Sequence, residues 1–234
     1  MKIMKSLIVI VGVVALASGA TYAAWFATQA SADNKVTAGT LSFALSANSD
    51  GGGSTQGLFS KAGLAPGDFI GERTLYFTNT GSISGKVKLN ISYSDWDVSN
   101  QGGSNADDFA RQLQLTSAST DGYTGMPAIW AGQIVRHVPA YNNTYATALA
   151  DKAIYMDSAN TYAPTMYGLS KIPFYFETDD GNGANPIEWT GNAKHSSTLN
   201  FKLSNDAPNR MQGNGINAAL TATMLQYNQS GWDI

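Results

Sequence analysis

The sequence predicts an all-β protein, built as a single-domain antiparallel β-sandwich with short helical excursions. Apolar and polar residues alternate over many short segments, which is the period of half-buried strands. Clusters of Gly, Asn, Asp, Ser and Pro separate these segments, as expected for tight turns. Only 13% of the residues are charged and 24 are glycine, a composition that suits short strands joined by turns.

The clearest predicted strand is the one in which Val87, Leu89, Ile91 and Tyr93 alternate with polar residues. The same alternation predicts strands at Leu41/Phe43/Leu45, Leu75/Phe77, Leu199/Phe201/Leu203 and Leu220/Ala222/Met224. Shorter strands are expected within Ile172 to Phe176 and Ile187 to Trp189, where Pro173 limits the first to a sheet edge.

Turns and helices are predicted between these strands. Pro66-Gly67 suits a type II turn, and the sequence from Asn79 to Gly81 suits a hairpin. One helix is expected to begin near Ser104, with Asp107 and Asp108 in its first turn, and to continue through Phe109, Arg111 and Leu113. Asn143 or Thr144 is a candidate cap for another helix, running through Leu149, Ala153 and Met156. Residues 120–170 otherwise show weak periodicity and are predicted to form an excursion between strands.

The first 23 residues have the features of a secretory signal peptide. Lys2 and Lys5 precede an apolar run from Leu7 to Ala17, which is too short to span a bilayer comfortably. Small residues then favour cleavage between Ala23 and Ala24, so residues 1–23 are expected to be removed and the protein to be secreted. The alternative is an uncleaved membrane anchor, with Tyr22, Trp25 and Phe26 at the interface.

Charge and composition disfavour several functional classes. The net charge is −3, and loss of Lys2 and Lys5 makes the mature chain more negative, so no basic field attracts nucleic acid. The chain has no cysteine, which removes disulfides and thiolate chemistry. Its two histidines, His137 and His195, are far apart and outside any H-E-x-x-H pattern. We therefore assign no catalytic residue, metal site or cofactor.

Several short motifs occur in a characteristic order along residues 19–118 and again in the last strands. They are Gly19–Ala24, Thr37–Leu41, Leu64–Asp68, Phe77–Ser82, Tyr93–Trp96, Gly102–Asn105, Asp108–Phe109 and Leu220–Met224. In this order they resemble the TasA/camelysin family of exported biofilm-matrix fibre proteins, which includes archaeal bundling pili among its relatives. The resemblance covers residues 19–118 and the last strands well, and residues 120–190 poorly.

The resemblance implies a jelly-roll-like sandwich that polymerises into extracellular fibres by donor-strand exchange. Residues 24–33 would be the donor strand, which fills a gap in the next subunit, and residues 34–234 the sandwich. The donor residues would be Ala24, Trp25, Phe26, Thr28, Ala30 and Ala32, with the face of Phe26, Thr28, Ala30 and Ala32 entering the groove because it is the more apolar. The partners would be further copies in a head-to-tail homopolymer, signal peptidase, and an anchor or capping protein. Contact with the membrane is expected only before processing.

Other interpretations remain open at this stage. Residues 24–33 are alternatively a disordered tail or a first strand that folds back into its own domain. The protein is alternatively a monomeric β-domain, secreted or tethered, that binds cell-surface glycan through Tyr141, Tyr145, Tyr155, Tyr162 and Tyr167. A camelysin-like metalloprotease is less favoured, because two scattered histidines supply no ligand pair. A type IV pilin lacks the expected Glu near the mature N-terminus.

Two kinds of surface site are also considered. Oxygen ligands for calcium are offered by Asp95, Asp97, Asp107 and Asp108, and by Asp179, Asp180 and Asn182, but helix capping and turns explain these residues better. Asn90, Asn142 and Asn228 match the N-glycosylation sequon.

Overall fold

A computed structural model describes residues 26–29, 43–46, 57–61, 64–95, 105–120, 125–176, 187–211 and 216–226. The predicted signal peptide, its cleavage position at Ala23 and Ala24, and the donor residues Trp25, Ala30 and Ala32 lie outside these residues. So do Asn228 and the acidic or amide residues Asp97, Asp179, Asp180 and Asn182.

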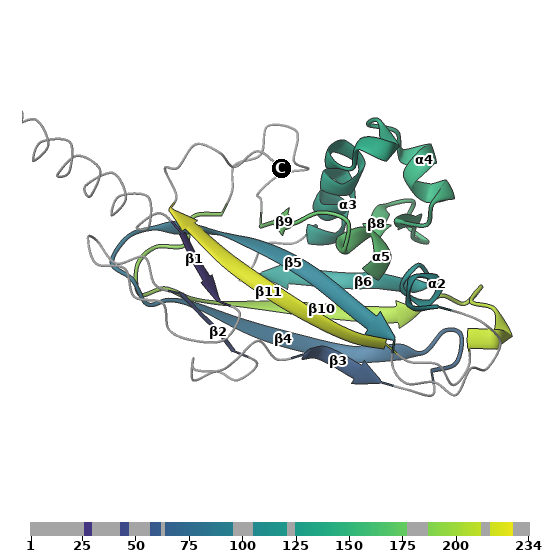
Figure 1. The fold of residues 1–234 in the computed structure, drawn as a ribbon, viewed down its shortest axis with the longest axis horizontal. Coiled ribbons are helices and arrows are strands. Elements are labelled where there is room, and N and C mark those ends of the chain that lie inside the picture. The colour runs from purple at the N-terminus through teal and green to yellow at the C-terminus, as the bar shows by residue number, and fades with distance from the viewer. Residues whose placement is uncertain are drawn as a thin grey trace, which may run out of the picture.

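The prediction of an all-β fold is confirmed, because two antiparallel sheets form the body of the described chain (Figure 1). The first sheet has the order β1 (Phe26–Gln29), β11 (Ile216–Gln226), β5 (Gly85–Asp95) and β9 (Phe174–Tyr175), and β3 (Gly57–Lys61) also pairs with β11. The second sheet has the order β2 (Phe43–Ser46), β4 (Phe69–Asn79), β10 (Lys194–Leu203) and β6 (Leu113–Thr120). The jelly-roll topology remains a prediction.

The predicted alternation produces the core between the sheets. Val87, Leu89 and Ile91 of β5 are each 1% exposed, and their counterparts in the other long strands are equally buried. Those counterparts are Leu75, Phe77, Leu199, Phe201, Leu203, Leu220, Ala222 and Met224, all in one hydrophobic cluster. Burying each large side chain contributes roughly 1.5–3 kcal/mol. Lys86 is an exception to the pattern, since it is 5% exposed on the alternate face of β5.

An excursion, residues 125–176, is inserted between β6 and β10, close to the predicted range. It contains α3 (Met126–His137), η1 (Pro139–Tyr141), α4 (Tyr145–Ala150), β7 (Ile154–Met156), β8 (Tyr162–Pro164), α5 (Met166–Leu169) and β9. Its helices lie together at one side of the sheets in Figure 1. Outside it are two short elements, α2 (Ala106–Ala110) and η2 (Asn209–Met211).

The predicted helix near residue 104 is shorter than expected. Asn105 caps α2, its Oδ1 accepting from Asp108 N at 2.8 Å, and Asp107 and Asp108 lie in the first turn as predicted. The extension through Leu113 is wrong, because Leu113 begins β6. Leu113, Leu115 and Ala118 of that strand are buried in the core, and this burial outweighs continuation of the helix.

The second predicted helix also ends early. Thr144 is the N-cap of α4, but the helix ends at Ala150 and Met156 belongs to β7. The chain reverses at Lys152, whose φ is 57°. Ala153 N donates to Ala148 O at 3.0 Å and Lys152 N to Leu149 O at 3.0 Å, the two bonds of a Schellman motif. A lysine at the position usually taken by glycine hides this stop signal in the sequence.

The longest helix in the described ranges, α3, was not predicted. Its residues Met126 and Ile129 to Val135 are all buried, so the helix has no polar face to produce an amphipathic period. Gly125 with a φ of 85°, followed by proline in the first turn, was a usable start signal.

Of the two predicted turns, the type II turn at Pro66-Gly67 is confirmed, and the hairpin at Asn79–Gly81 is wrong. That turn joins β4 and β5, which belong to different sheets and do not pair with each other. In the first, Asp68 N donates to Ala65 O at 3.0 Å, and Gly67 has the φ of 90° that a type II turn requires. Gly67 N also donates to Leu203 O at 2.9 Å, which fixes this turn to the end of β10.

The second turn is organised by Asn79, which is fully buried. Its Nδ2 donates to Ile83 O at 2.8 Å and to Trp189 O at 2.9 Å, while its Oδ1 accepts from Gly81 N at 3.0 Å. One amide therefore closes the β4–β5 turn and joins it to the segment that leads into β10.

We predict that Asn79→Ala lowers the free energy of unfolding by about 2–4 kcal/mol, because it removes all three hydrogen bonds of a buried amide and leaves the buried Gly81 N–H without this partner. Chemical denaturation measures this loss. Asn90→Ala, at an exposed position of β5, is the matched control and should change the value by less than about 0.5 kcal/mol. Equal effects of the two substitutions would contradict the proposed role of Asn79.

Candidate functional site

The predicted donor segment contains strand β1, which lies at the outer edge of the first sheet (Figure 1). Phe26 is opposite Leu225, and the register runs on to Gln29 opposite Ala222. The segment thus pairs with β11 of its own chain, as the alternative of a first strand folding back proposed. Its transfer to a second copy remains a prediction.

The register also relates β1 to the two faces of β11. Phe26 and Thr28 stand opposite Leu225 and Thr223, which are half-buried, whereas Ala27 and Gln29 stand opposite the fully buried Met224 and Ala222. Within this chain, Phe26 and Thr28 are therefore not opposite the core-facing residues of β11. We predicted that the face of the donor strand that carries Phe26 and Thr28 enters a groove in a second copy, and this stays a prediction.

The outer edge of β11 is shared by two short strands. β3 pairs with Ile216 to Ala219, and β1 pairs with Ala222 to Leu225. On its other side β11 pairs with β5 along its whole length, from Ile216 opposite Asp95 to Gln226 opposite Gly85. Displacing β1 would consequently expose four residues of β11 and leave the rest of its pairing in place.

The excursion covers the opposite edge of each sheet. Gln133 Oε1 accepts from Tyr175 N at 3.0 Å, and Tyr175 O accepts from Gln133 Nε2 at 3.2 Å and from Trp130 Nε1 at 2.8 Å. Both backbone groups of Tyr175 in β9 are therefore satisfied by α3. On the second sheet, Thr165 bridges Gln114 of β6 and the Tyr155 hydroxyl donates to Leu115 O at 2.7 Å. These contacts satisfy backbone groups along part of each edge, which disfavours pairing with another strand there.

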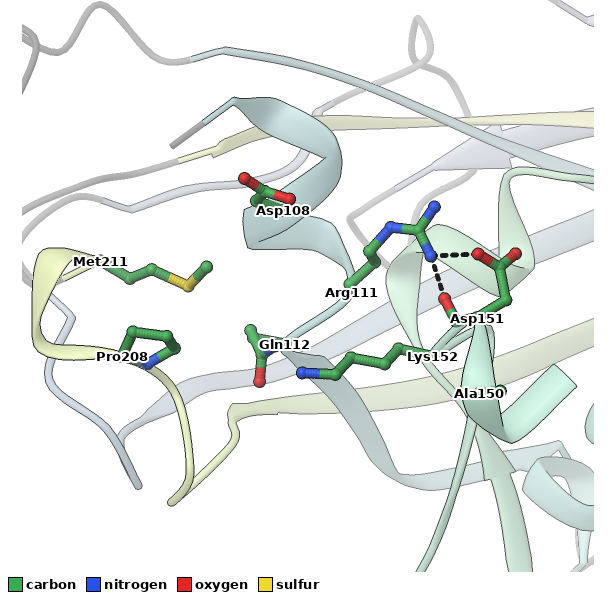
Figure 2. Close-up of a pocket in the computed structure, with 8 residues that line it drawn as sticks. All are labelled: Asp108, Arg111, Gln112, Ala150, Asp151, Lys152, Pro208 and Met211. Carbon is green, nitrogen blue, oxygen red and sulfur yellow. Dashed lines mark hydrogen bonds and ion pairs between the residues drawn. The ribbon is translucent and has the colours of Figure 1, made fainter. Parts of the chain in front are cut away.

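A pocket of about 280 Å³ lies where the excursion meets the end of the sandwich (Figure 2). It is lined by Asp108, Arg111, Gln112, Ala150, Asp151, Lys152, Pro208 and Met211. These residues come from α2 and the turn after it, from the end of α4, and from the η2 region. The lining is polar on the side of the excursion and apolar at Pro208 and Met211.

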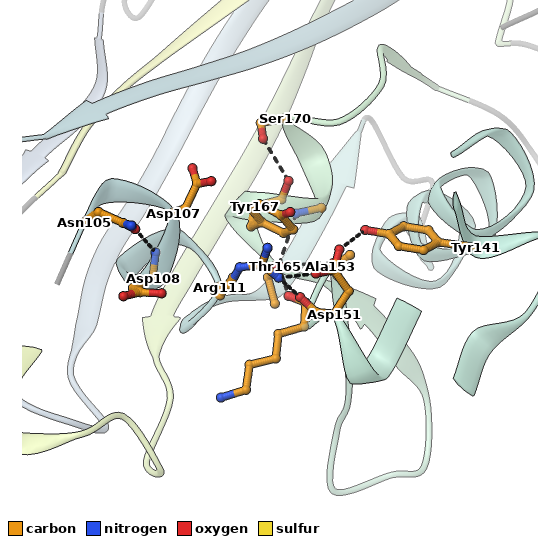
Figure 3. A network of polar contacts seen from close by, with 12 residues as sticks. Asn105, Asp107, Asp108, Arg111, Tyr141, Asp151, Ala153, Thr165, Tyr167 and Ser170 are labelled. Atoms are coloured by element: carbon orange, nitrogen blue, oxygen red, sulfur yellow. Dashed lines mark hydrogen bonds and ion pairs between the residues drawn. The ribbon is translucent and has the colours of Figure 1, made fainter. Parts of the chain in front are cut away.

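A polar network beside this pocket fastens the excursion to the sandwich (Figure 3). Arg111 forms an ion pair with Asp151 at 2.5 Å and also donates to the Asp151 backbone oxygen. The Tyr141 hydroxyl donates to the other Asp151 carboxylate oxygen at 2.6 Å. The Arg111 guanidinium lies 3.5 Å from the centre of the Tyr167 ring, and Lys171 Nζ lies 3.9 Å from it.

The network shifts the pKa values of its members. Burial alone would raise the pKa of Asp151, but the Tyr141 hydroxyl and the Arg111 guanidinium outweigh it and hold that pKa below the usual value. The pKa of Tyr141 is raised, first by burial and then by Asp151. Burial, together with Asp157, raises the pKa of Tyr155 to about 12.

The five tyrosines considered for glycan binding do not form one exposed face. Tyr141 and Tyr167 are 2% and 6% exposed, and Tyr155 is held by its bond to Leu115 O. Tyr145 and Tyr162 do stack on each other, with ring centres 4.4 Å apart. Internal packing thus accounts for three of the five.

The two histidines and Asp107 have contacts or positions that a structural role explains. His137 ends α3, where a basic side chain suits the helix dipole, and His195 in β10 stacks on Trp189 with ring centres 4.5 Å apart. Asp107 accepts from the Tyr93 hydroxyl at 2.8 Å. Among the residues that the structure describes, no group of three or more His, Asp or Glu side chains is placed to hold a metal ion.

The sequon residues that the structure describes are both exposed. Asn90 lies within β5, and Asn142 follows η1 with a φ of 46°. Glycosylation of either remains a prediction.

We predict that Asp151→Asn destabilises the protein at neutral pH by about 1–2 kcal/mol, since it removes a charge-assisted contact to Arg111 that is partly exposed. The lowered pKa of Asp151 means that the unfolded chain binds a proton first as the pH falls below 3.8, so the stabilisation from Asp151 is lost in that range. The variant should lack this component of acid sensitivity in denaturation curves measured at several pH values. Asp206→Asn, at an exposed position, is the control, and an unchanged acid dependence in Asp151→Asn would refute the assignment.

None of the helices in the described ranges is long and apolar enough to cross a membrane. A family model described as camelysin metallo-endopeptidase matches residues 1–124, which is more than half of the chain. No curated protein matches the sequence. The matched region contains most of the motifs on which the resemblance was based, including the turns at Pro66-Gly67 and Asn79–Gly81. The chain belongs to the camelysin/TasA family.

Proposed function

We propose that this protein is the structural subunit of an extracellular biofilm fibre or pilus, and that it polymerises by donating β1 to the outer edge of β11 in the next copy. The observation that carries the proposal is the divided edge of β11, where β1 occupies a separate four-residue slot. Family membership supports the same role.

Exchange of β1 requires no new binding surface. A strand from a second copy can form the same backbone hydrogen bonds with Ala222 to Leu225 that β1 forms within its own chain. With a net contribution of about 0.5–1.5 kcal/mol for each bond, four paired residues hold β1 only moderately in place. Further residues of the segment 24–33 would add bonds in a neighbour and make exchange favourable.

The geometry also gives the polymer a direction. The donated strand and the receiving edge are different surfaces of the subunit, so the contact is heterologous and continues into a filament. The excursion covers the far edges of both sheets with Gln133, Thr165 and Tyr155. Growth through the β11 edge is therefore the favoured route.

A second candidate is a monomeric surface domain, which the pairing of β1 within its own chain favours. In that case β1 would be a permanent edge strand. The two candidates differ in whether residue 28 of one chain meets residue 223 of the same chain or of a neighbour.

A cysteine pair distinguishes them. Thr28 is opposite Thr223 in the register, and directly opposed residues have Cβ atoms about 4.5–5.5 Å apart, close to disulfide distance. The native chain has no cysteine, so only the introduced residues can react. We predict that the variant Thr28→Cys/Thr223→Cys, oxidised after assembly, gives a ladder of covalent oligomers on a denaturing gel without reductant.

The control pair is Thr221→Cys/Asn90→Cys, which joins β11 to β5 within one chain and should give monomers only. If Thr28→Cys/Thr223→Cys gives only monomers, the result supports the monomeric surface domain and contradicts the strand-exchanging fibre. Removal of residues 24–33 should likewise abolish fibres, and fibres of unchanged morphology in electron micrographs would count against strand donation.

A further inference from the structure

The pocket in Figure 2 is lined by a side-chain amide, that of Gln112, which forms no hydrogen bond within the described part of the chain. Gln112 is 6% exposed, and its side chain makes no hydrogen bond with any described residue, although its backbone N and O are both bonded. The Gln112 amide is not among the fully enclosed side-chain groups that lack a partner, and it lines the pocket, so it is open to a molecule bound there. A ligand that supplied both a donor and an acceptor could bond both ends of this amide.

Another glutamine of this protein shows which chemical group can bond both ends of a side-chain amide. Gln133 is fully buried, and its amide is satisfied by the backbone N and O of Tyr175 at 3.0 and 3.2 Å. A side-chain amide and a peptide backbone thus match as donor and acceptor pairs. Gln112 offers the same pair of groups to the interior of the pocket.

Two charges of opposite sign flank Gln112. Neither the Asp108 carboxylate nor the Lys152 ammonium forms an ion pair or a hydrogen bond with a described side chain, whereas Arg111 and Asp151 are already paired. In Figure 2 the Lys152 side chain extends toward Gln112, while Asp108 lies on another side of the pocket, above Gln112 in this view. Pro208 and Met211 form the apolar wall opposite the cations.

We propose that this pocket binds a short peptide with free ends, of about the size of a dipeptide. Its ammonium group would bind Asp108, its peptide group Gln112, and its carboxylate Lys152, with one small apolar side chain against Pro208 and Met211. A volume of about 280 Å³ suits this size, because pockets for larger, drug-like molecules run from about 300 to 1,000 Å³. The site is separate from the β11 edge, so it does not depend on strand exchange.

The test is calorimetric titration of the full chain with L-alanyl-L-alanine at millimolar concentrations. Wild-type protein should bind it. Gln112→Met, which keeps the side-chain length and removes the amide, should weaken binding about tenfold or more without lowering the melting temperature. Lys152→Gln and Asp108→Asn should each weaken binding about tenfold, which keeps the test valid if one variant fails to fold.

Two further ligands define the specificity. The dipeptide with acetylated and amidated ends should bind at least about tenfold more weakly, because it lacks both charges. N-acetylglucosamine, which carries an amide but no charged ends, should not bind. The proposal is overturned if the dipeptide does not bind, if Gln112→Met binds it as wild type does, if the blocked dipeptide binds equally well, or if only the sugar binds.

Discussion

The arrangement of the first sheet depends on the pairing of β11 with β5. Its residues Leu220, Ala222 and Met224 are buried in the core, and β5 pairs with it along all eleven residues. This side fixes β11 firmly. In the described part of the chain, its other side is covered by two strands of four or five residues. Because unpaired strand edges attract other strands, the short cover over Ala222 to Leu225 is where the proposed exchange would admit a second chain.

At the β9 and β6 edges, the excursion occupies backbone groups that would otherwise be open to another strand. Gln133 and Trp130 satisfy the backbone of Tyr175, and the bridge from Thr165 does the same for part of β6. An ion pair between Arg111 and Asp151, supported by Tyr141 and Tyr167, holds the excursion against the sandwich. This arrangement agrees with the proposed fibre, in which pairing would occur at the β11 edge and not at the edges that the excursion contacts.

The long strands could be predicted because each has one buried and one exposed face, so that Val87, Leu89 and Ile91 produce a period of two. Helix α3 could not, since it is buried all round and has no such contrast. The end of α4 was missed because Lys152, and no glycine, adopts the left-handed conformation. The candidate sites were harder still. The family resemblance predicted a strand within residues 24–33, but only the tertiary fold shows the register of β1 on β11 and brings Asp108, Gln112 and Lys152 together from separate elements.

Two turns inside the matched region bear on whether this protein acts as an enzyme or as a structural subunit. Gly67 and Asp68 are used in a turn bound to β10, and all three strong hydrogen-bonding positions of the Asn79 amide are taken by backbone groups. A catalytic motif keeps polar atoms available for substrate or metal. In these two turns, by contrast, the polar atoms form hydrogen bonds within the fold. The family match covers residues 1–124 and ends before the excursion, which begins at Gly125. The two turns lie inside the matched region, whereas Ala150, Asp151 and Lys152 of the pocket lie beyond it.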